Sequence, residues 1–167
     1  PRLWQRDADW LRFRAEGGMT REVISHFLFF SERVLGPLSL LSAHTTYPDD
    51  SSLCETGVLA RLVTEKKQEV SILGTVGGAQ PDRQELTVKG TKTSRRVTDF
   101  HRDSISDGRD FTSLREPPED ARATSLKAQL DDLSLHLASK PNRLATMEEA
   151  FRVQTLVEGI LDETGKR

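Results

Sequence analysis

The chain has 167 residues, which is long enough for one domain, and 35% of them are hydrophobic, which provides the side chains for a hydrophobic core. Its net charge of -2 provides no broad basic surface, which argues against nucleic acid and anionic membranes as partners. No apolar run reaches the roughly 18 residues of a transmembrane helix, and the single cysteine, Cys54, excludes an intramolecular disulfide and favours a cytoplasmic location.

The first 35 residues predict an extended segment followed by a helix. Residues 1–18 have aromatic side chains among alternating charges and no clear period, which indicates an extended segment. Because the chain starts with Pro1 rather than Met, we expect a further part before it. From residue 19 to 35 apolar side chains recur every three or four positions, and Gly36-Pro37 ends the run, which predicts an amphipathic helix.

A series of short segments rich in Val, Leu, Ile and Thr follows this helix. Short polar or glycine-containing turns join them, and connections this short require antiparallel neighbours. We therefore predict a meander of about five strands. Several segments have apolar residues on both sides, so one sheet face is expected to pack against helices and the other against a second copy of the chain. The predicted strands are residues 38–47, 56–64, 68–76, 84–89 and 93–101.

The last third of the chain predicts a loop and two helices. Residues 103–118 are polar and indicate a loop, and a helix is predicted over residues 119–139. The final helix opens at Thr146, which forms a capping box with Glu149. The chain 1–167 is thus predicted to be a single α+β domain, with helices packed on one face of a mainly antiparallel sheet. The apolar stripe of the helix over residues 119–139 consists of Leu126, Leu130, Leu133 and Leu137.

The segment around the start of the first helix contains the candidate functional residues. Gly17-Gly18 before a helix would let a ligand approach free backbone N–H groups, which favour an anionic or oxygen-rich group. Glu22 and His26 are four residues apart and share one helix face. The imidazole can accept a proton from a substrate hydroxyl, and the carboxylate can fix its tautomer. The same spacing also fits an ordinary surface pair, which stabilises a helix by only ~0.3 kcal/mol.

This segment resembles the Gly-Gly-Gly-x-x-x-Asp-x-x-x-His signature of the glucose-fructose oxidoreductase, inositol dehydrogenase and rhizopine-catabolism (Gfo/Idh/MocA) family. The matching residues are Glu16-Gly17-Gly18, then Glu22, then His26. Two positions depart from the signature, because glutamate stands in place of the first glycine and of the aspartate. These departures put catalysis in question, whereas the fold does not depend on them.

Other parts of the chain resemble the same family in the same order. Residues 85–94 are similar to its strand-Gly-Thr-turn-strand hairpin, residues 145–161 to its closing helix, and Trp10-Leu11-Arg12 to a Trp-Arg pair upstream of the signature. The resemblance implies that the parent protein has an N-terminal Rossmann domain that binds NAD or NADP. This chain would then be the C-terminal α+β domain, which forms homo-oligomers through its open sheet face.

The resemblance also implies roles for individual residues. His26 takes the place of the histidine that transfers a proton at the oxidised carbon of a sugar-like substrate, and Glu22 the place of the acid that assists it. Gly17, Gly18 and Arg12 are expected to bind the substrate. The chain has no counterpart of the family's Glu-Lys-Pro lysine and no strand followed by Gly-x-Gly-x-x-Gly, so alone it is expected to bind no dinucleotide and to be inactive.

The sequence leaves two other functions open. One is a non-catalytic module whose sheet dimerises and whose helix face binds a carbohydrate or a protein; the two-sided apolar strands and the glutamate at position 22 favour it. The other is a structural domain in which the Glu22–His26 pair has no function. The four histidines and Cys54 have no metal-ligand spacing, so no metal site is predicted.

Overall fold

The computed structural model describes residues 8–162, which form two compact units. Unit 1 comprises residues 8–78 and 146–162, and unit 2 comprises Ala79–Ala145. Both units contain antiparallel sheets, and residues 8–162 also contain three α-helices, so the predicted α+β class is confirmed.

The strands predicted as one meander belong to two sheets, a three-stranded sheet in unit 1 and a four-stranded sheet in unit 2. The predicted single sheet was therefore wrong. The division falls in the connection before residue 85, which is polar and contains Gly77 and Gly78, both with positive φ. Backbone in that conformation does not continue a strand ladder, so the chain leaves one sheet before it starts the next.

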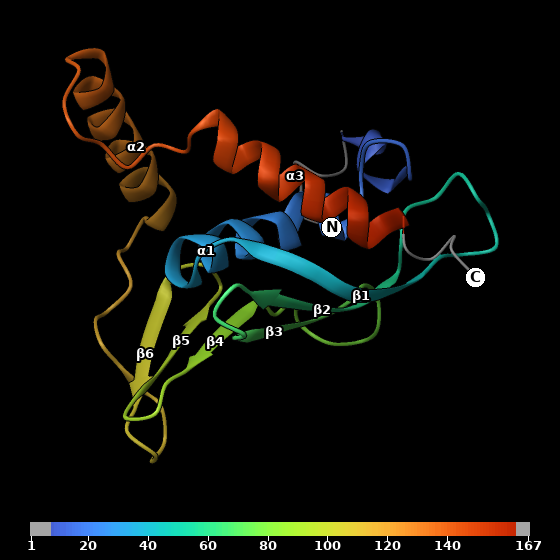
Figure 1. The fold of residues 1–167 in the computed structure, drawn as a ribbon, viewed down its shortest axis with the longest axis horizontal. Helices are drawn as coiled ribbons and strands as arrows, with labels where there is room; N and C mark the ends of the chain where they lie inside the picture. The colour runs from blue at the N-terminus through green and yellow to red at the C-terminus, as the bar shows by residue number, and fades with distance from the viewer. Residues whose placement is uncertain (1–7, 163–167) are drawn as a thin grey trace. The chain divides into compact units, whose positions relative to one another are not determined.

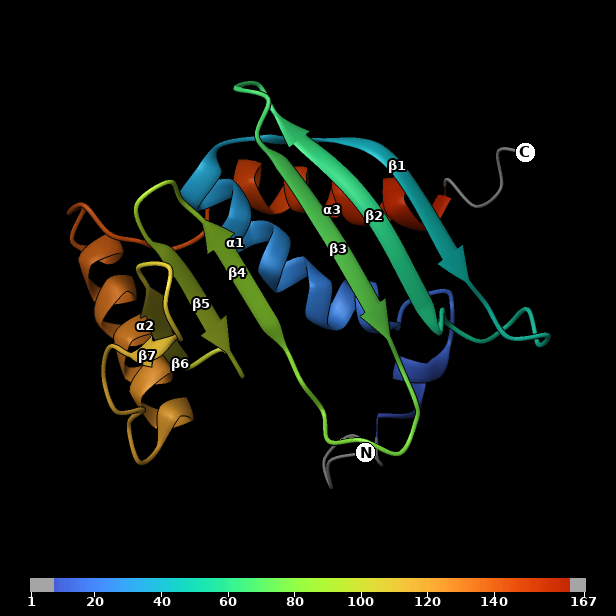
Figure 2. The ribbon, with the colours of Figure 1, turned by 90° about the horizontal axis from the view of Figure 1, so that it is seen from below.

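Unit 1 consists of a sheet with two helices over one face (Figures 1 and 2). α1 (Ser25–Leu35) and α3 (Met147–Asp162) lie over that face. Along β2, every second residue from Val58 to Thr64 is buried, which is the period of a strand with one covered face. The strands follow the order β1-β2-β3 and are β1 (Leu38–Thr46), β2 (Gly57–Thr64) and β3 (Glu69–Thr75).

The core of unit 1 lies between this sheet and the helices α1 and α3. Its buried positions on α3 recur at three- and four-residue spacings, so the helix buries one apolar stripe. Leu62 and Ile160 are completely buried. The buried apolar residues are Ile24, Leu28, Leu38, Val58, Ala60, Leu62, Val153, Leu156, Val157, Ile160 and Leu161.

The opposite face of this sheet is exposed. Leu59 and Leu73 are directly paired in the β2–β3 register and are 55% and 79% exposed. Arg61 and Glu69 form an exposed ion pair of 2.9 Å on the same two strands. The chain itself therefore covers one of the two apolar sheet faces, and the described residues leave the other accessible.

The capping box predicted at the start of α3 is confirmed. The backbone N–H of Glu149 donates to the Thr146 hydroxyl at 3.2 Å, and the backbone N–H of Thr146 donates to Glu149 Oε2 at 2.9 Å. Arg33 of α1 also donates to both carboxylate oxygens of Glu149, at 3.0 and 2.8 Å. One carboxylate thus caps α3 and links it to α1.

Glu149 is expected to make unit 1 sensitive to acid. Its hydrogen bonds from Arg33, and secondly from the Thr146 backbone, lower the pKa of Glu149 from 4.5 to about 2. A carboxyl group with a lowered folded-state pKa contributes stability above its unfolded pKa, and this contribution is lost as the pH falls from 4.5 to about 2. We expect Tm, followed by circular dichroism, to fall less over that range in Glu149→Gln than in the wild type. Glu69→Gln should keep the wild-type fall, and an undiminished fall in Glu149→Gln would contradict the assignment.

Unit 2 contains the second sheet and a helix. Its strands follow the order β4-β5-β6-β7, and α2 (Ala121–Leu137) comes after them. The loop predicted over residues 103–118 was wrong in part, because β6 pairs with β5 along its full length. Two of the polar side chains that suggested a loop interact across the strands instead: Asp103 forms an ion pair with Arg95, and the Ser104 hydroxyl donates to the Arg96 carbonyl. The strands are β4 (Glu85–Lys89), β5 (Ser94–Thr98), β6 (Arg102–Ser106) and β7 (Thr112–Ser113).

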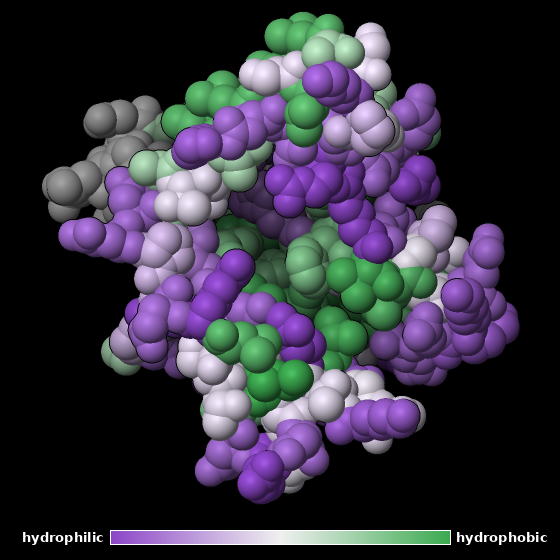
Figure 3. Space-filling view, turned by 90° about the vertical axis from the view of Figure 1, so that its left-hand side faces the viewer, coloured by the Kyte–Doolittle hydropathy of each residue, from purple (hydrophilic) through white to green (hydrophobic). Residues whose placement is uncertain are grey.

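The helix α2 exposes the leucine stripe that its sequence predicts. Asp120 caps the helix by accepting a hydrogen bond of 2.9 Å from the Ala123 N–H. The four leucines of the stripe are between 42% and 77% exposed, and hydrophobic residues reach the surface at the top of Figure 3, where α2 lies. The stripe therefore exists on the helix, but the described residues do not bury it.

The segment predicted to be extended, residues 1–18, is only partly within the described residues. Residues 1–7 lie outside them. The rest contains a short 3-10 helix, η2 (Asp9–Arg12), and an antiparallel bridge between Phe13 and Leu53, so the prediction was wrong for η2. This segment folds back on the chain, because Leu11 and Arg12 supply carbonyl oxygens to later backbone N–H groups.

Candidate functional site

The helix with the candidate catalytic residues begins with a π-helical turn, η3 (Thr20–Ile24), that leads into α1. The backbone N–H of Ser25 donates to the carbonyl oxygen of Thr20, five residues earlier. The Ser25 hydroxyl donates to the Arg21 carbonyl at 2.5 Å, so the wider turn does not leave this oxygen without a donor. Single π-turns inside helices occur frequently at functional sites.

Glu22 lies in this π-turn, and His26 lies in the first turn of α1. Both side chains are exposed, whereas Ile24 and Leu28 of the same helix are buried in the core. The core therefore fixes one face of the helix and leaves Glu22 and His26 accessible to a ligand. Because the π-turn widens the helix between them, their relative direction differs from that in a regular α-helix, which the sequence spacing assumed.

Gly17 and Gly18 are buried against atoms of the chain itself. A Cβ atom at Gly17 would lie 2.2 Å from the carbonyl oxygen of Leu11. Gly18 has a φ of +107°, and a Cβ atom there would lie 2.4 Å from Glu55 Oε2. The two glycines therefore permit a close approach, as the sequence indicated, but the groups that approach them are the Leu11 backbone and the Glu55 carboxylate.

Glu55 is the residue of this site that sequence reasoning missed. Its side chain is only 1% exposed, and Oε1 accepts a hydrogen bond of 2.6 Å from the backbone N–H of Thr20. Glu55 comes just before β2, and a single acidic residue at that place in a sequence carries no signature. Nothing in the sequence pairs it with a residue 35 positions earlier.

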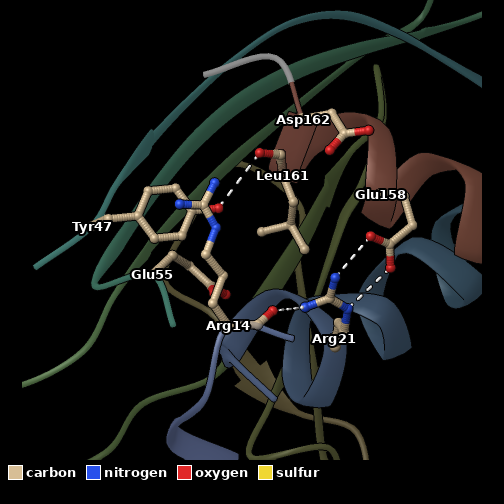
Figure 4. A pocket seen from close by; sticks show the side chains of 7 residues that line it. All are labelled: Arg14, Arg21, Tyr47, Glu55, Glu158, Leu161 and Asp162. Carbon is tan, nitrogen blue, oxygen red and sulfur yellow. Dashed lines mark hydrogen bonds and ion pairs between the residues drawn. The ribbon is translucent and has the colours of Figure 1, made fainter. Parts of the chain in front are cut away.

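A small polar cavity of about 60 Å³ lies beside Glu55 (Figure 4). Arg21 forms a two-pronged ion pair with Glu158, at 3.0 and 2.8 Å, and this pairing raises the pKa of Arg21. The Arg14 guanidinium stacks 3.9 Å from the centre of the Tyr47 ring, and burial raises the pKa of Tyr47. A cavity of this size holds water molecules rather than a sugar, so it is not the substrate site. Its lining residues are Arg14, Arg21, Tyr47, Glu55, Glu158, Leu161 and Asp162.

Arg12, the remaining predicted site residue, has an exposed side chain in η2. It forms an ion pair of 3.0 Å with Asp9, and its guanidinium lies 4.9 Å from the centre of the Phe13 ring. Its carbonyl oxygen accepts a hydrogen bond of 2.8 Å from the N–H of Cys54, next to Glu55. The backbone of Arg12 is thus joined to the segment that contains Glu55, while its side chain is accessible from solvent.

Two features are absent from the described residues. Within residues 8–162, no group of three or more His, Cys, Asp or Glu side chains is arranged to hold a metal ion. No helix in that range is both long and apolar enough to cross a membrane.

Comparison with known proteins identifies the fold. An oxidoreductase from Agrobacterium radiobacter in complex with NAD+, L-tartaric acid and magnesium matches with a TM-score of 0.75 and 15% identity, over 99% of this chain and 52% of its own. The dehydrogenase MviM from Clostridium difficile matches with a TM-score of 0.71 and 12% identity, over 90% of this chain and 48% of its own. The WlbA dehydrogenase from Bordetella pertussis, in complex with NADH and UDP-GlcNAcA, matches with a TM-score of 0.70 and 19% identity, over 96% and 50%.

The chain has the fold of the C-terminal domain of Gfo/Idh/MocA-type oxidoreductases. The fold that the sequence resemblance implied is therefore confirmed. The chain spans about half the length of the solved structures that it matches. No family model and no curated protein sequence matches it.

Proposed function

We propose that this chain is the substrate-binding and oligomerisation half of an NAD(P)-dependent oxidoreductase that acts on a sugar, a polyol or a related hydroxy compound. The fold supports the proposal, because the chain matches half of a dehydrogenase whose structure contains NADH and UDP-GlcNAcA, and half of an oxidoreductase whose structure contains NAD+ and L-tartaric acid. The chain has no glycine-rich dinucleotide motif between a strand and a helix. We therefore assign NAD(P), which accepts the hydride when bound, to an N-terminal Rossmann domain of the parent protein.

The observation that carries the proposal is the exposure of His26 and Glu22 on a helix fixed by the core of this fold. In the proposed reaction, the neutral imidazole of His26 accepts the proton of the substrate hydroxyl as the carbon is oxidised, and Glu22 stabilises the imidazolium. Arg12 contributes hydrogen-bond donors to substrate oxygens. Gly17 and Gly18 contribute through the shape of the helix start, because both are packed against the chain itself.

The proposed role of His26 is tested in the protein joined to its native N-terminal domain. We expect His26→Ala to lower kcat by about 10²-fold or more on the preferred substrate of a sugar and polyol panel, the usual contribution of a general base. His136→Ala is the matched control, because His136 is exposed on α2 and belongs neither to the proposed site nor to the open sheet face. Equal turnover by the wild type and His26→Ala would remove this residue from the mechanism.

A second function is a non-catalytic module that dimerises through its sheet and binds a carbohydrate or a protein. It is favoured by the glutamate at position 22 together with the exposed pair Leu59 and Leu73. The oxidoreductase proposal also includes sheet pairing between two copies, so oligomerisation alone does not separate the two functions. Turnover by the joined protein separates them, because the non-catalytic module shows none. Light scattering tests the shared interface: a monomer at high micromolar concentration would exclude pairing through Leu59 and Leu73.

A further inference from the structure

The structure assigns Glu55 as the positioning residue of the His26 site: its buried carboxylate caps the helix start and thereby sets where Glu22 and His26 lie. This inference rests on the proposed function, since it concerns the same site. The two glycines then bring the helix start close to a carboxylate of this chain, whereas the sequence suggested a ligand at this place.

Gly18 lies at the start of the helix. Its carbonyl oxygen accepts the first hydrogen bond of the helix, 3.0 Å from the N–H of Glu22, so Gly18 occupies the N-cap position. An N-cap residue normally uses a side-chain oxygen to accept a hydrogen bond from the N–H two or three residues later. Glycine has no side chain, and Glu55 supplies the oxygen instead, 2.6 Å from the N–H of Thr20.

The charge and burial of Glu55 make this cap strong. A carboxylate at a helix N-terminus interacts favourably with the helix dipole, and a hydrogen bond to an ionised acceptor is stronger than a neutral one. Because Glu55 is only 1% exposed, little solvent screens the interaction. The backbone conformation of Gly18, at φ +107°, and its missing Cβ are what let the second oxygen, Oε2, lie against the chain at this point.

The cap acts on the candidate catalytic residues through the π-turn. Thr20 takes part in both interactions. Its N–H donates to the Glu55 carboxylate, and its carbonyl oxygen accepts the π-type hydrogen bond from the N–H of Ser25. Glu22 lies inside that turn and His26 directly follows Ser25. Displacement of Thr20 therefore changes the direction of both side chains, while the buried residues of α1 farther along the helix keep their packing.

The test uses the chain of 167 residues and nuclear magnetic resonance. Glu55→Gln keeps the size of the side chain and removes its charge. We expect the Thr20 amide proton to move upfield and to exchange with solvent about tenfold faster, since a hydrogen bond to a charged group is lost. The ring signals of His26 should move as well, while those of Leu62 in the core stay unchanged. Glu69→Gln, which alters an exposed carboxylate of β3, should move neither Thr20 nor His26.

Chemical rescue of Glu55→Ala by a free carboxylate is a second measurement, and a purely structural role of Glu55 would not produce this rescue. In Glu55→Ala, millimolar formate should restore the wild-type Thr20 and His26 signals in a saturable way, because a free carboxylate takes the place of the deleted one. Formate should leave the wild-type spectrum unchanged. A Glu55→Gln spectrum with Thr20 and His26 at their wild-type positions would overturn the assignment, and so would a folded Glu55→Ala that formate does not restore. If Glu55→Ala does not fold, the Glu55→Gln spectrum alone decides.

These measurements need neither a cofactor nor turnover. Equal turnover by the wild type and His26→Ala would disprove the proposed function and leave the Glu55 cap intact. Unchanged Thr20 and His26 signals in Glu55→Gln would disprove the cap and leave the proposed function intact. The two failures are therefore distinguishable.

Discussion

Gly18→Ala is expected to lower the free energy of unfolding of unit 1 by about 3 kcal/mol. A positive φ at a residue with a Cβ atom costs about 1 to 2 kcal/mol. The added Cβ would lie 2.4 Å from Glu55 Oε2, which is buried, so the carboxylate must also move away from the N–H of Thr20, at a further cost of about 1 to 2 kcal/mol. Urea denaturation followed by tryptophan fluorescence measures the loss, because Trp10 is next to Leu11, whose carbonyl oxygen accepts a hydrogen bond from the N–H of Gly18.

Gly36→Ala is the matched control for this substitution. Gly36, at the end of α1, has a φ of +97°, and an added Cβ would have no atom within 4 Å. Only the backbone cost of about 1 to 2 kcal/mol is therefore expected there. The difference between the two variants measures the contact between Gly18 and Glu55, and equal losses would show that this contact contributes nothing to stability.

The secondary structure could be predicted from the sequence where the signal is local. The strand predicted over residues 56–64 is Gly57–Thr64 in the structure, and the capping box at Thr146 is present with both its hydrogen bonds. Alternation of side chains and helix-start chemistry involve residues that are near one another in the chain, so a short window contains the whole signal. The helix predicted over residues 19–35, which η3 and α1 form in the structure, was predicted for the same reason.

Of the candidate site, the sequence could predict only the residues that are close to one another in the chain. Two glycines before a helix indicate that something approaches the backbone closely, but they do not specify whether it is a ligand or a side chain of the same protein. The answer, Glu55, depends on packing between segments that are 35 residues apart. The strand β6 was missed for a related reason, since β-pairing of the polar segment Arg102–Ser106 depends on its partner Ser94–Thr98.

Leu62→Ala is expected to destabilise unit 1 by about 3 kcal/mol, because Leu62 is completely buried and its truncation leaves a cavity between β2 and the helices. Leu73→Ala is the matched control on the neighbouring strand. Its side chain is 79% exposed, so the expected change in the free energy of unfolding is within about 0.5 kcal/mol at low protein concentration. Urea denaturation measures both variants.

The same pair of variants connects the fold to the proposed assembly. If a second copy covers the exposed sheet face, its binding stabilises the folded chain by mass action, so the midpoint of unfolding rises with protein concentration. Leu73→Ala should then reduce this concentration dependence, because it removes apolar area from the shared face, whereas Leu62→Ala should lower the midpoint equally at every concentration. A wild-type midpoint independent of concentration up to high micromolar would show that the face of Leu59 and Leu73 does not pair.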